Sequence, residues 1–315
     1  MSKRRRRRAS PLTSLLRGSI FFLILLGFGL FIFITQKAGD SSSIFPAFRQ
    51  PLGNTRRPSP PRPSPHTTPV NTPPSLNFPQ INEPSENEVP LRAQHRKYKY
   101  RIAIVIDDVG YDLPLLEEFL KLNIPLTFSI LPNLNNSSVS AQLARRYGRT
   151  IILHMPMQAE MNLPMDENFI TVDLTSPEVS SRIERALQSV PGVVGMSNHM
   201  GSLATQNEKI MDAVMSTLAK HNLFFLDSLT TPHSVGQKCA RNWGVPYLKR
   251  DVFLDNEDDP EYILGQLKEL VSIALRKGKA IGIGHLKAKT LEALKLALPY
   301  FEEKNVKVVP LNELL

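Results

Sequence analysis

The chain has 315 residues and a formal net charge of +9. Residues 1–100 hold 16 Lys and Arg against 4 Asp and Glu, whereas residues 101–315 hold 22 Lys and Arg against 25 Asp and Glu. The basic excess therefore belongs to the N-terminal third, and the mildly acidic remainder argues against a nucleic-acid partner. The single cysteine, Cys239, excludes an intramolecular disulfide and a cysteine-rich zinc site.

The first 36 residues predict a membrane anchor. A basic N-terminus, residues 1–17, carries the cationic block Lys3–Arg8, and residues 18–36 contain no charge. A helix of that length spans about 28 Å, close to the ~30 Å hydrocarbon thickness of a bilayer. Because positive charge stays cytoplasmic, we expect a single-pass protein of the inner (cytoplasmic) membrane with its C-terminal domain on the periplasmic or cell-wall side. A cleaved signal peptide is the alternative, but Gln36 stands where cleavage requires a small residue.

Residues 37–97 predict a disordered linker. Thirteen of the 26 prolines lie between Pro46 and Pro90, and apolar residues are sparse there. Such a segment buries too little surface to offset its ordering entropy. As a flexible coil it would span about 40–50 Å and give the following domain reach away from the bilayer. Recognition of this segment by a protein partner is the less favoured alternative.

Residues 98–315 predict a domain of alternating strands and helices. The expected strands are short apolar runs, at 101–106, 125–130, 150–153, 193–196, 223–226, 280–283 and 306–309. Helical spacing and N-cap residues predict helices that begin near residues 112, 138, 175, 207, 259 and 291. Continuous apolar strands joined by helices indicate a parallel sheet covered by helices, either a barrel or a doubly wound sheet. No G-x-G-x-x-G follows the first strand, which favours a barrel of seven or eight strands.

Polar side chains follow the predicted strands, at the edge where βα folds carry their sites. These residues are Asp107, Asp108, His154, Asn198, His199, Asp227, Ser228 and His285. Carboxylates and imidazoles together suit a divalent ion such as zinc.

The neighbours Asp107 and Asp108 raise a geometric question. Successive strand residues point to opposite faces, so the two carboxylates share a site only if the strand ends there, and Gly110 permits that turn. One aspartate then binds the metal while the other stays free as a base. The alternative is that both pair with nearby helix N-termini.

Five motifs carry a family resemblance: Ile-Asp107-Asp108-Val-Gly-Tyr, Leu-His154-Met-Pro-Met, Asn-His199-Met-Gly-Ser, Phe-Leu-Asp227-Ser228 and Ile-Gly-His285. Over residues 101–315 they resemble the divergent polysaccharide deacetylase family, a branch of the metal-dependent deacetylases that fold as a distorted βα barrel. The resemblance implies Asp107 as base, Asp108 as a metal ligand and His285 as acid. The superfamily takes two ligand histidines from one H-x-x-x-H run, whereas Gln158 stands four residues after His154 here. His199, from a different strand, is therefore expected to join His154 as the second ligand.

Together these expectations describe a membrane-anchored, extracytoplasmic, metal-dependent hydrolase, with zinc as the expected divalent metal, that deacetylates N- or O-acetylated cell-envelope glycan, peptidoglycan included. A zinc-bound water would lose its proton to Asp107, and His285 would protonate the leaving group. Asp227 is expected to orient His285 or Asp107, or else to cap a turn. Asn198 and Ser228 are expected to donate hydrogen bonds to substrate hydroxyls. The acidic stretch Asp251–Asp259 is interpreted as solvated, with Asp259 as a helix cap.

Two other classes remain open at this point. The same barrel with a degenerate site would be a non-catalytic protein that binds glycan or acts as a scaffold in the envelope. A phosphoesterase ranks last, because the strand ends show no cluster of lysines and arginines.

Overall fold

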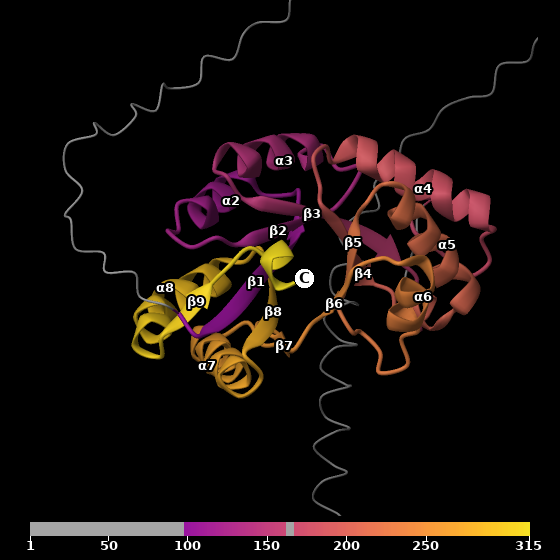
Figure 1. Cartoon of the computed structure of the whole chain (residues 1–315). Coiled ribbons are helices and arrows are strands. Elements are labelled where there is room, and N and C mark those ends of the chain that lie inside the picture. Colours follow the sequence, from indigo (N-terminus) through magenta and orange to yellow (C-terminus); the bar gives the residue numbers. More distant parts are fainter. Residues whose placement is uncertain (1–97, 162–166) are drawn as a thin grey trace, which may run out of the picture. The chain divides into compact units, whose positions relative to one another are not determined.

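The computed structural model describes residues 98–161 and 167–315 (Figure 1). The predicted basic N-terminus 1–17, anchor 18–36 and linker 37–97 lie outside these residues and stay predictions. Within the described residues, no helix combines the length and hydropathy that crossing a bilayer requires.

One parallel sheet forms the centre of the domain, and it curls into an incomplete barrel (Figure 1). In the described residues its strands follow the order β6-β5-β4-β3-β2-β1-β8-β7, and β9 pairs with the start of β1. The strands are β1 Tyr100–Val109, β2 Thr127–Ile130, β3 Thr150–Met157, β4 Gly195–Met200, β5 Phe224–Asp227, β6 Tyr247–Lys249, β7 Val252–Phe253, β8 Lys279–His285 and β9 Val306–Val308. The predicted parallel βα architecture is confirmed, with the sheet open between β6 and β7.

Helices surround the sheet on its outer side (Figure 1). They are α2 Leu113–Leu120, α3 Ser137–Arg146, α4 Ser176–Ser189, α5 Glu208–Lys220, α6 Gly236–Trp243, α7 Pro260–Lys277 and α8 Ala288–Glu303, with the short 3₁₀ helices η2 Ala204–Gln206 and η3 Leu311–Leu314. Three predicted N-caps are confirmed. Asp112 accepts from the backbone N–H of Leu115, Asp259 accepts from that of Tyr262, and Thr175 forms a capping box with Glu178.

The sheet is apolar on both faces, which explains why its strands lack polar alternation. On β1, Ile102, Ile104 and Ile106 belong to the core between the sheet and the helices. The intervening Ala103 and Val105 belong to a smaller cluster inside the barrel, together with Leu311 and Leu314 of η3. The C-terminal turn thus fills the barrel at the end where β1 begins, as the central position of the C-terminus in Figure 1 shows. The opposite end, where the strands finish, is left for polar side chains.

Several elements differ from the predicted ones. β1, β3 and β4 run past their apolar stretches, so that Asp107, Asp108, His154 and His199 lie within strands rather than after them. The sequence gives little sign of β6, β7 and α6, because β6 and β7 have only 3 and 2 residues and α6 carries mostly polar residues.

Candidate metal centre and catalytic site

An irregularity in β1 brings the two neighbouring aspartates to one site. The pairing of β1 with β2 shifts register between Ile106 and Val109, and Asp108 has a φ of 59°. Aspartate is among the residues that tolerate this left-handed conformation, and such a bulge redirects the side chain that follows it. A bulge inside the strand therefore takes the place of the predicted strand end at Gly110. As predicted, the two carboxylates can then share one site.

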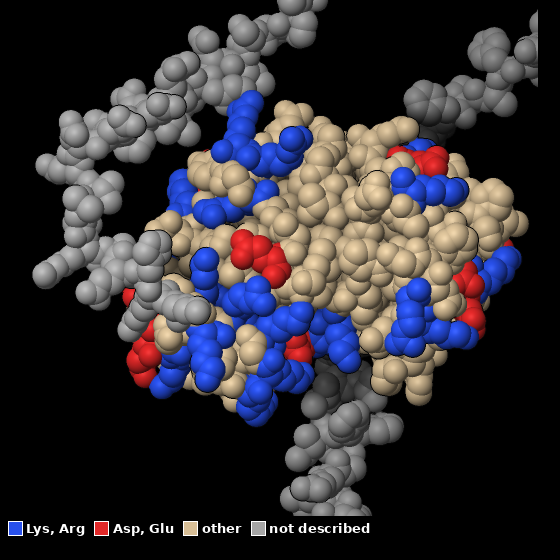
Figure 2. All heavy atoms as spheres, viewed as in Figure 1, with Lys and Arg blue, Asp and Glu red and all other residues tan. Residues whose placement is uncertain are grey.

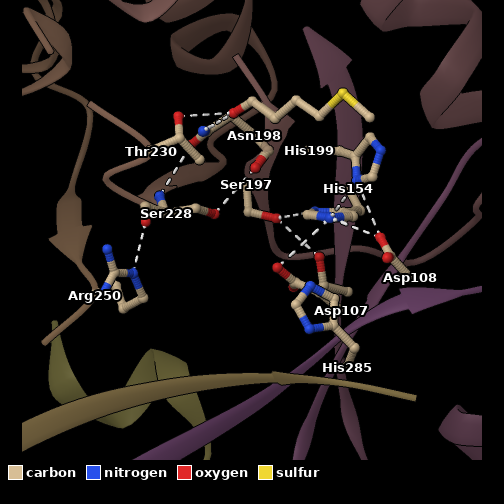
Figure 3. Close-up of polar contacts among 12 residues, drawn as sticks. Asp107, Asp108, His154, Ser197, Asn198, His199, Ser228, Thr230, Arg250 and His285 are labelled. Atoms are coloured by element: carbon tan, nitrogen blue, oxygen red, sulfur yellow. Dashed lines mark hydrogen bonds and ion pairs between the residues drawn. The ribbon is translucent and has the colours of Figure 1, made fainter. Parts of the chain in front are cut away.

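Asp108, His154 and His199 form a tight cluster from three strands, β1 and the adjacent pair β3 and β4, with β2 between β1 and β3 (Figure 3). The Oδ1 atom of Asp108 lies 3.0 Å from Nδ1 of His199 and 3.3 Å from Nε2 of His154. The two imidazole nitrogens lie 3.2 Å apart. The structure thus brings together the three residues predicted as metal ligands, despite the absence of an H-x-x-x-H run.

A buried serine pair holds His154 in place. Nδ1 of His154 lies 2.8 Å from the hydroxyl of Ser197, which lies 2.8 Å from the hydroxyl of Ser129. Both serines are fully buried. With Nδ1 bonded in this way, Nε2 is the atom that His154 presents to the cluster. Fixing the second ring nitrogen of a histidine ligand in this manner is common in metal sites.

Asp107 lies beside this cluster and is only 2% exposed. Its Oδ2 atom lies 3.5 Å from Nε2 of His154, and its Oδ1 atom has no hydrogen-bond partner among the described residues. Burial raises the pKa of Asp107, and the nearby imidazoles of His154 and His285 oppose that rise without cancelling it. For Asp108, burial is outweighed by the two imidazoles beside it, so its pKa is held well below the usual range of an aspartate. The two neighbours therefore have opposite protonation behaviour, one as a fixed anion and the other as a stronger base.

His285 completes the site at the end of β8, where its backbone pairs with that of Asp107 (Figure 3). Nδ1 of His285 lies 2.8 Å from Oδ1 of Asp255, whose Oδ2 accepts from the His285 backbone N–H and from the hydroxyl of Thr290. Burial lowers the pKa of His285, but the Asp255 carboxylate outweighs it and the net pKa is raised. The raised pKa favours the protonated imidazole. Since Nδ1 is bonded to Asp255, Nε2 is the nitrogen that is left to donate a proton to another group.

The amino-acid sequence of this domain matches a known protein family. Residues 104–315 match the family described as divergent polysaccharide deacetylase. The chain belongs to the divergent polysaccharide deacetylase family. The family that the sequence motifs resemble is thus confirmed.

Three similar proteins are each named as uncharacterized. A protein of Haemophilus influenzae is 33% identical over 221 residues, which cover 67% of this chain and 79% of the relative. The protein YibQ of Escherichia coli is 33% identical over 195 residues, 62% of this chain and 61% of the relative. The crystal structure of an uncharacterized protein from Agrobacterium tumefaciens C58 has a TM-score of 0.66 at 23% identity, covering 69% of this chain and 89% of that one. The last likeness shows that the fold is shared.

The cluster fits the divalent ion that a deacetylase fold implies. One carboxylate and two imidazoles supply the ligand types and the number that catalytic zinc sites use, and they leave a fourth position open. Oδ1 of Asp108 is buried and has no hydrogen-bond partner among the described residues, although both imidazoles approach it. Buried polar atoms in folded proteins are nearly always paired, and a divalent cation held by all three residues would supply a partner for this oxygen.

The Asp227 carboxylate bonds to residues other than His285 and Asp107, which it was predicted to orient. It is fully buried, and its carboxylate accepts from the backbone N–H of Leu229 and from the hydroxyls of Ser234 and Tyr247. These bonds tie the end of β5 to the start of α6 and to β6. The carboxylate that orients His285 is therefore Asp255, and Asp227 occupies the other role considered for it, the capping of a turn.

Asn198 and Ser228 also differ from the predicted arrangement. The backbone N–H of Ser228 donates to Oδ1 of Asn198, and the Ser228 hydroxyl donates to the Asn198 carbonyl (Figure 3). Nδ2 of Asn198 donates to the carbonyl of Met200. Both side chains are buried and their polar atoms are engaged with one another, so they join β4 to β5 instead of facing a substrate hydroxyl.

Asp255 was missed because it sits in the acidic stretch interpreted as solvated. It directly follows Leu254, the residue after the two-residue strand β7, so it lies just past a strand end, where βα folds carry their site residues. A strand of two residues gives no periodicity to recognise. The signal available in the sequence was the apolar run Val252-Phe-Leu254 that precedes it.

The Asp255–His285 pair predicts a specific pH dependence. Asp255→Asn removes the hydrogen-bonded carboxylate that most strongly raises the pKa of His285, and leaves burial, which lowers that pKa, opposed only by the weaker effects of Asp107 and Asp108. Since the protonated imidazole is the form required of an acid, the alkaline limb of the kcat/KM profile should move to lower pH. Asp227→Asn is the matched variant, as another buried carboxylate close in the chain. A shift of that limb in Asp227→Asn, with none in Asp255→Asn, would restore Asp227 as the orienting residue.

Proposed function

We propose that the protein is a metal-dependent hydrolase that removes acetyl groups from cell-envelope carbohydrate, a peptidoglycan-type polymer included. Membership of the family and the barrel fold support a carbohydrate deacetylase-type function. The observation that carries the proposal is the placement of a buried carboxylate, Asp107, between the Asp108–His154–His199 cluster and the Asp255-bound His285. Acetate release from acetylated glycans by the metal-loaded chain tests it.

The chemistry divides among these residues by their protonation. Asp108, His154 and His199 would hold the ion, which when bound acidifies a water and polarises the acetyl carbonyl. Asp107 accepts a proton from the attacking water at Oδ1, the oxygen for which the described residues supply no hydrogen-bond partner, and its raised pKa makes it a stronger base than an ordinary aspartate. His285 donates a proton from Nε2 to the departing amine or alkoxide, while Asp255 stabilises the charged imidazole during the step. The base and the acid thus act from neighbouring strands, β1 and β8.

The cellular side of the proposal concerns residues 1–36. We propose that residues 18–36 anchor the chain in the inner membrane and that the cationic block keeps the N-terminus inside. A reporter that is active only outside the cytoplasm, fused after Leu315, should then be active. The control is a reporter that is active only in the cytoplasm, fused at the same residue. Activity of this control fusion, with none from the first, would contradict the proposed topology.

A further inference from the structure

Three cationic side chains lie next to one another at the end of the barrel opposite the proposed catalytic site. Arg101, near the start of β1, is paired with Lys279 on β8 and with Lys307 on β9. Each of the three stands two positions before a residue of the apolar cluster inside the barrel. Because alternate residues of a strand share a face, all three side chains lie at the mouth of the barrel, about 4.8 Å apart from strand to strand.

The described part of the chain does not neutralise this row. Among the described residues, no carboxylate forms an ion pair with any of the three. Arg101 donates to the carbonyl of Glu313 and Lys279 to that of Leu314, so both also hold η3 in place. Lys307 is exposed, and no hydrogen bond from a described residue reaches its side chain. Like charges on neighbouring strands destabilise a sheet, so the packing of the domain does not explain Lys307.

The row belongs to a wider basic surface. Figure 2 faces this end of the barrel and shows Lys and Arg gathered over β8, α7 and the start of β1. Two further lysines are exposed there, Lys99 just before β1 and Lys277 at the end of α7. Lys277 is paired with Asp251. The name basic end is used below for the surface formed by Lys99, Arg101, Lys277, Lys279 and Lys307.

Apolar surface adjoins these cations. A hollow of about 330 Å³ is lined by Lys307 and by Tyr98, whose side chain is 36% exposed. Most of its other lining residues are apolar, namely Ile124, Pro125, Leu298, Phe301, Val306 and Val308. Tyrosine beside lysine and arginine is typical of protein surfaces at a membrane–water interface, where the ring meets the apolar region and the cations meet phosphate.

The chain enters the domain at this same end. The first residues that the structure describes are Tyr98 and Lys99, directly before β1. The proposed anchor, residues 18–36, is therefore connected to the domain at the basic end and not at the catalytic end. A tether of residues 37–97 would hold the domain near the bilayer at an effective concentration in roughly the millimolar range. Under that condition a weakly attractive surface is enough for docking, and the same tether lets the domain leave again.

We propose that the basic end binds the anionic headgroups of a phospholipid bilayer, with Tyr98 at the interface. Docking in this way directs the catalytic end away from the lipid, because the two lie at opposite ends of the barrel. The inference goes beyond the proposed catalytic function and does not depend on it. The proposed anchor contributes only proximity. A polymer that carries phosphate groups is the other anionic partner, and the tyrosine, the apolar hollow and the point of chain entry favour the bilayer.

The test measures which lysines a bilayer covers. The purified full chain is transferred from detergent into nanodiscs of phosphatidylcholine, either alone or mixed with phosphatidylglycerol. A short pulse of an acetylating N-hydroxysuccinimide ester followed by mass spectrometry gives the labelling rate of each lysine. Each cation at an anionic surface contributes about a factor of five to binding. With phosphatidylglycerol, labelling of Lys99, Lys279 and Lys307 should therefore slow on the order of fivefold, and high salt should remove the effect.

Lys287 is the internal control, since it is an exposed lysine just after β8, at the catalytic end. Its labelling rate should be the same in both kinds of nanodisc. A matched pair of variants follows from the same two lysines. Lys307→Gln removes one cation of the row and should restore much of the labelling of Lys279 with phosphatidylglycerol present. Lys287→Gln removes one cation elsewhere and should leave the protection of Lys279 intact.

Every outcome decides between the bilayer and its alternatives. Equal labelling of the basic end in both nanodiscs, or equal slowing at Lys287, would overturn the proposal, as would failure to associate with either nanodisc. Protection by soluble polyphosphate, with none from phosphatidylglycerol, would identify a phosphate polymer as the partner instead. Association with both nanodiscs without protection would support the anchor and reject the docking surface. Association and protection only with phosphatidylglycerol would support the docking surface and reject the anchor.

Discussion

Asp107→Asn should lower the rate of acetate release by a factor of about 10²–10⁴, the usual contribution of a positioned acid or base. Asparagine keeps the shape of the side chain in its buried site but has no carboxylate to accept the proton. Because we assign the ion to Asp108 and the two histidines, bound metal should be nearly unchanged. Steady-state kinetics on the purified full chain, with metal content measured on the same sample, check both statements.

Two comparisons separate the role of Asp107 from a general disturbance of the site. His285→Ala should also lower turnover, most strongly for substrates with a poor leaving group, since those require protonation to depart. Asp107→Asn should slow good and poor leaving groups alike. A loss of metal in Asp107→Asn equal to the loss of activity would show that Asp107 is a ligand and not the base.

His154→Ala should abolish retention of the metal on dialysis and, with it, acetate release. The substitution removes one of the three proposed ligands, and the remaining two, Asp108 and His199, are partly exposed. Far-UV circular dichroism should stay close to that of the wild type, because the strand itself is held by its neighbours β2 and β4. Metal analysis after dialysis is the measurement.

The controls for this variant come from the same chain. His221→Ala removes an exposed histidine at the end of α5 and should leave the metal content unchanged. Asp108→Asn removes a ligand that is less buried than His154 and should lose the metal with less risk to folding. Full retention of metal in both His154→Ala and Asp108→Asn would exclude this cluster as the binding site.

Much of the fold follows from local chemistry that a single sequence displays. The caps at Asp112, Thr175 and Asp259 locate helix starts because a side chain there satisfies a backbone N–H that the helix leaves unpaired. The strands β1 and β8 are continuous apolar runs because both faces of the sheet are covered. β6 and β7 escape prediction because they are too short to show a pattern, and their place is set by pairing with β5 and β8.

The sequence predicts those site residues that directly follow apolar runs. Asp107, Asp108, His154, His199 and His285 follow apolar runs and meet at one end of the barrel. What the sequence does not carry is side-chain direction. Asn198 and Ser228 bond to each other, and Asp227 bonds to the loop that follows β5. The decisive partner of His285, Asp255, lies just after β7. These pairings depend on loop geometry, and the shared site of Asp107 and Asp108 depends on the bulge in β1; no local pattern encodes either.

Release of acetate by the zinc-loaded full chain, measured on a panel of N- and O-acetylated glycans, tests the central claim most directly. The panel includes the N-acetylglucosamine tetramer and peptidoglycan, with Asp107→Asn as the blank for non-enzymatic release. We expect acetate release that requires metal and is lost on chelation and in Asp107→Asn. A wild-type protein that binds metal and glycan but releases no acetate from any member of the panel would contradict it and identify a glycan-binding protein instead.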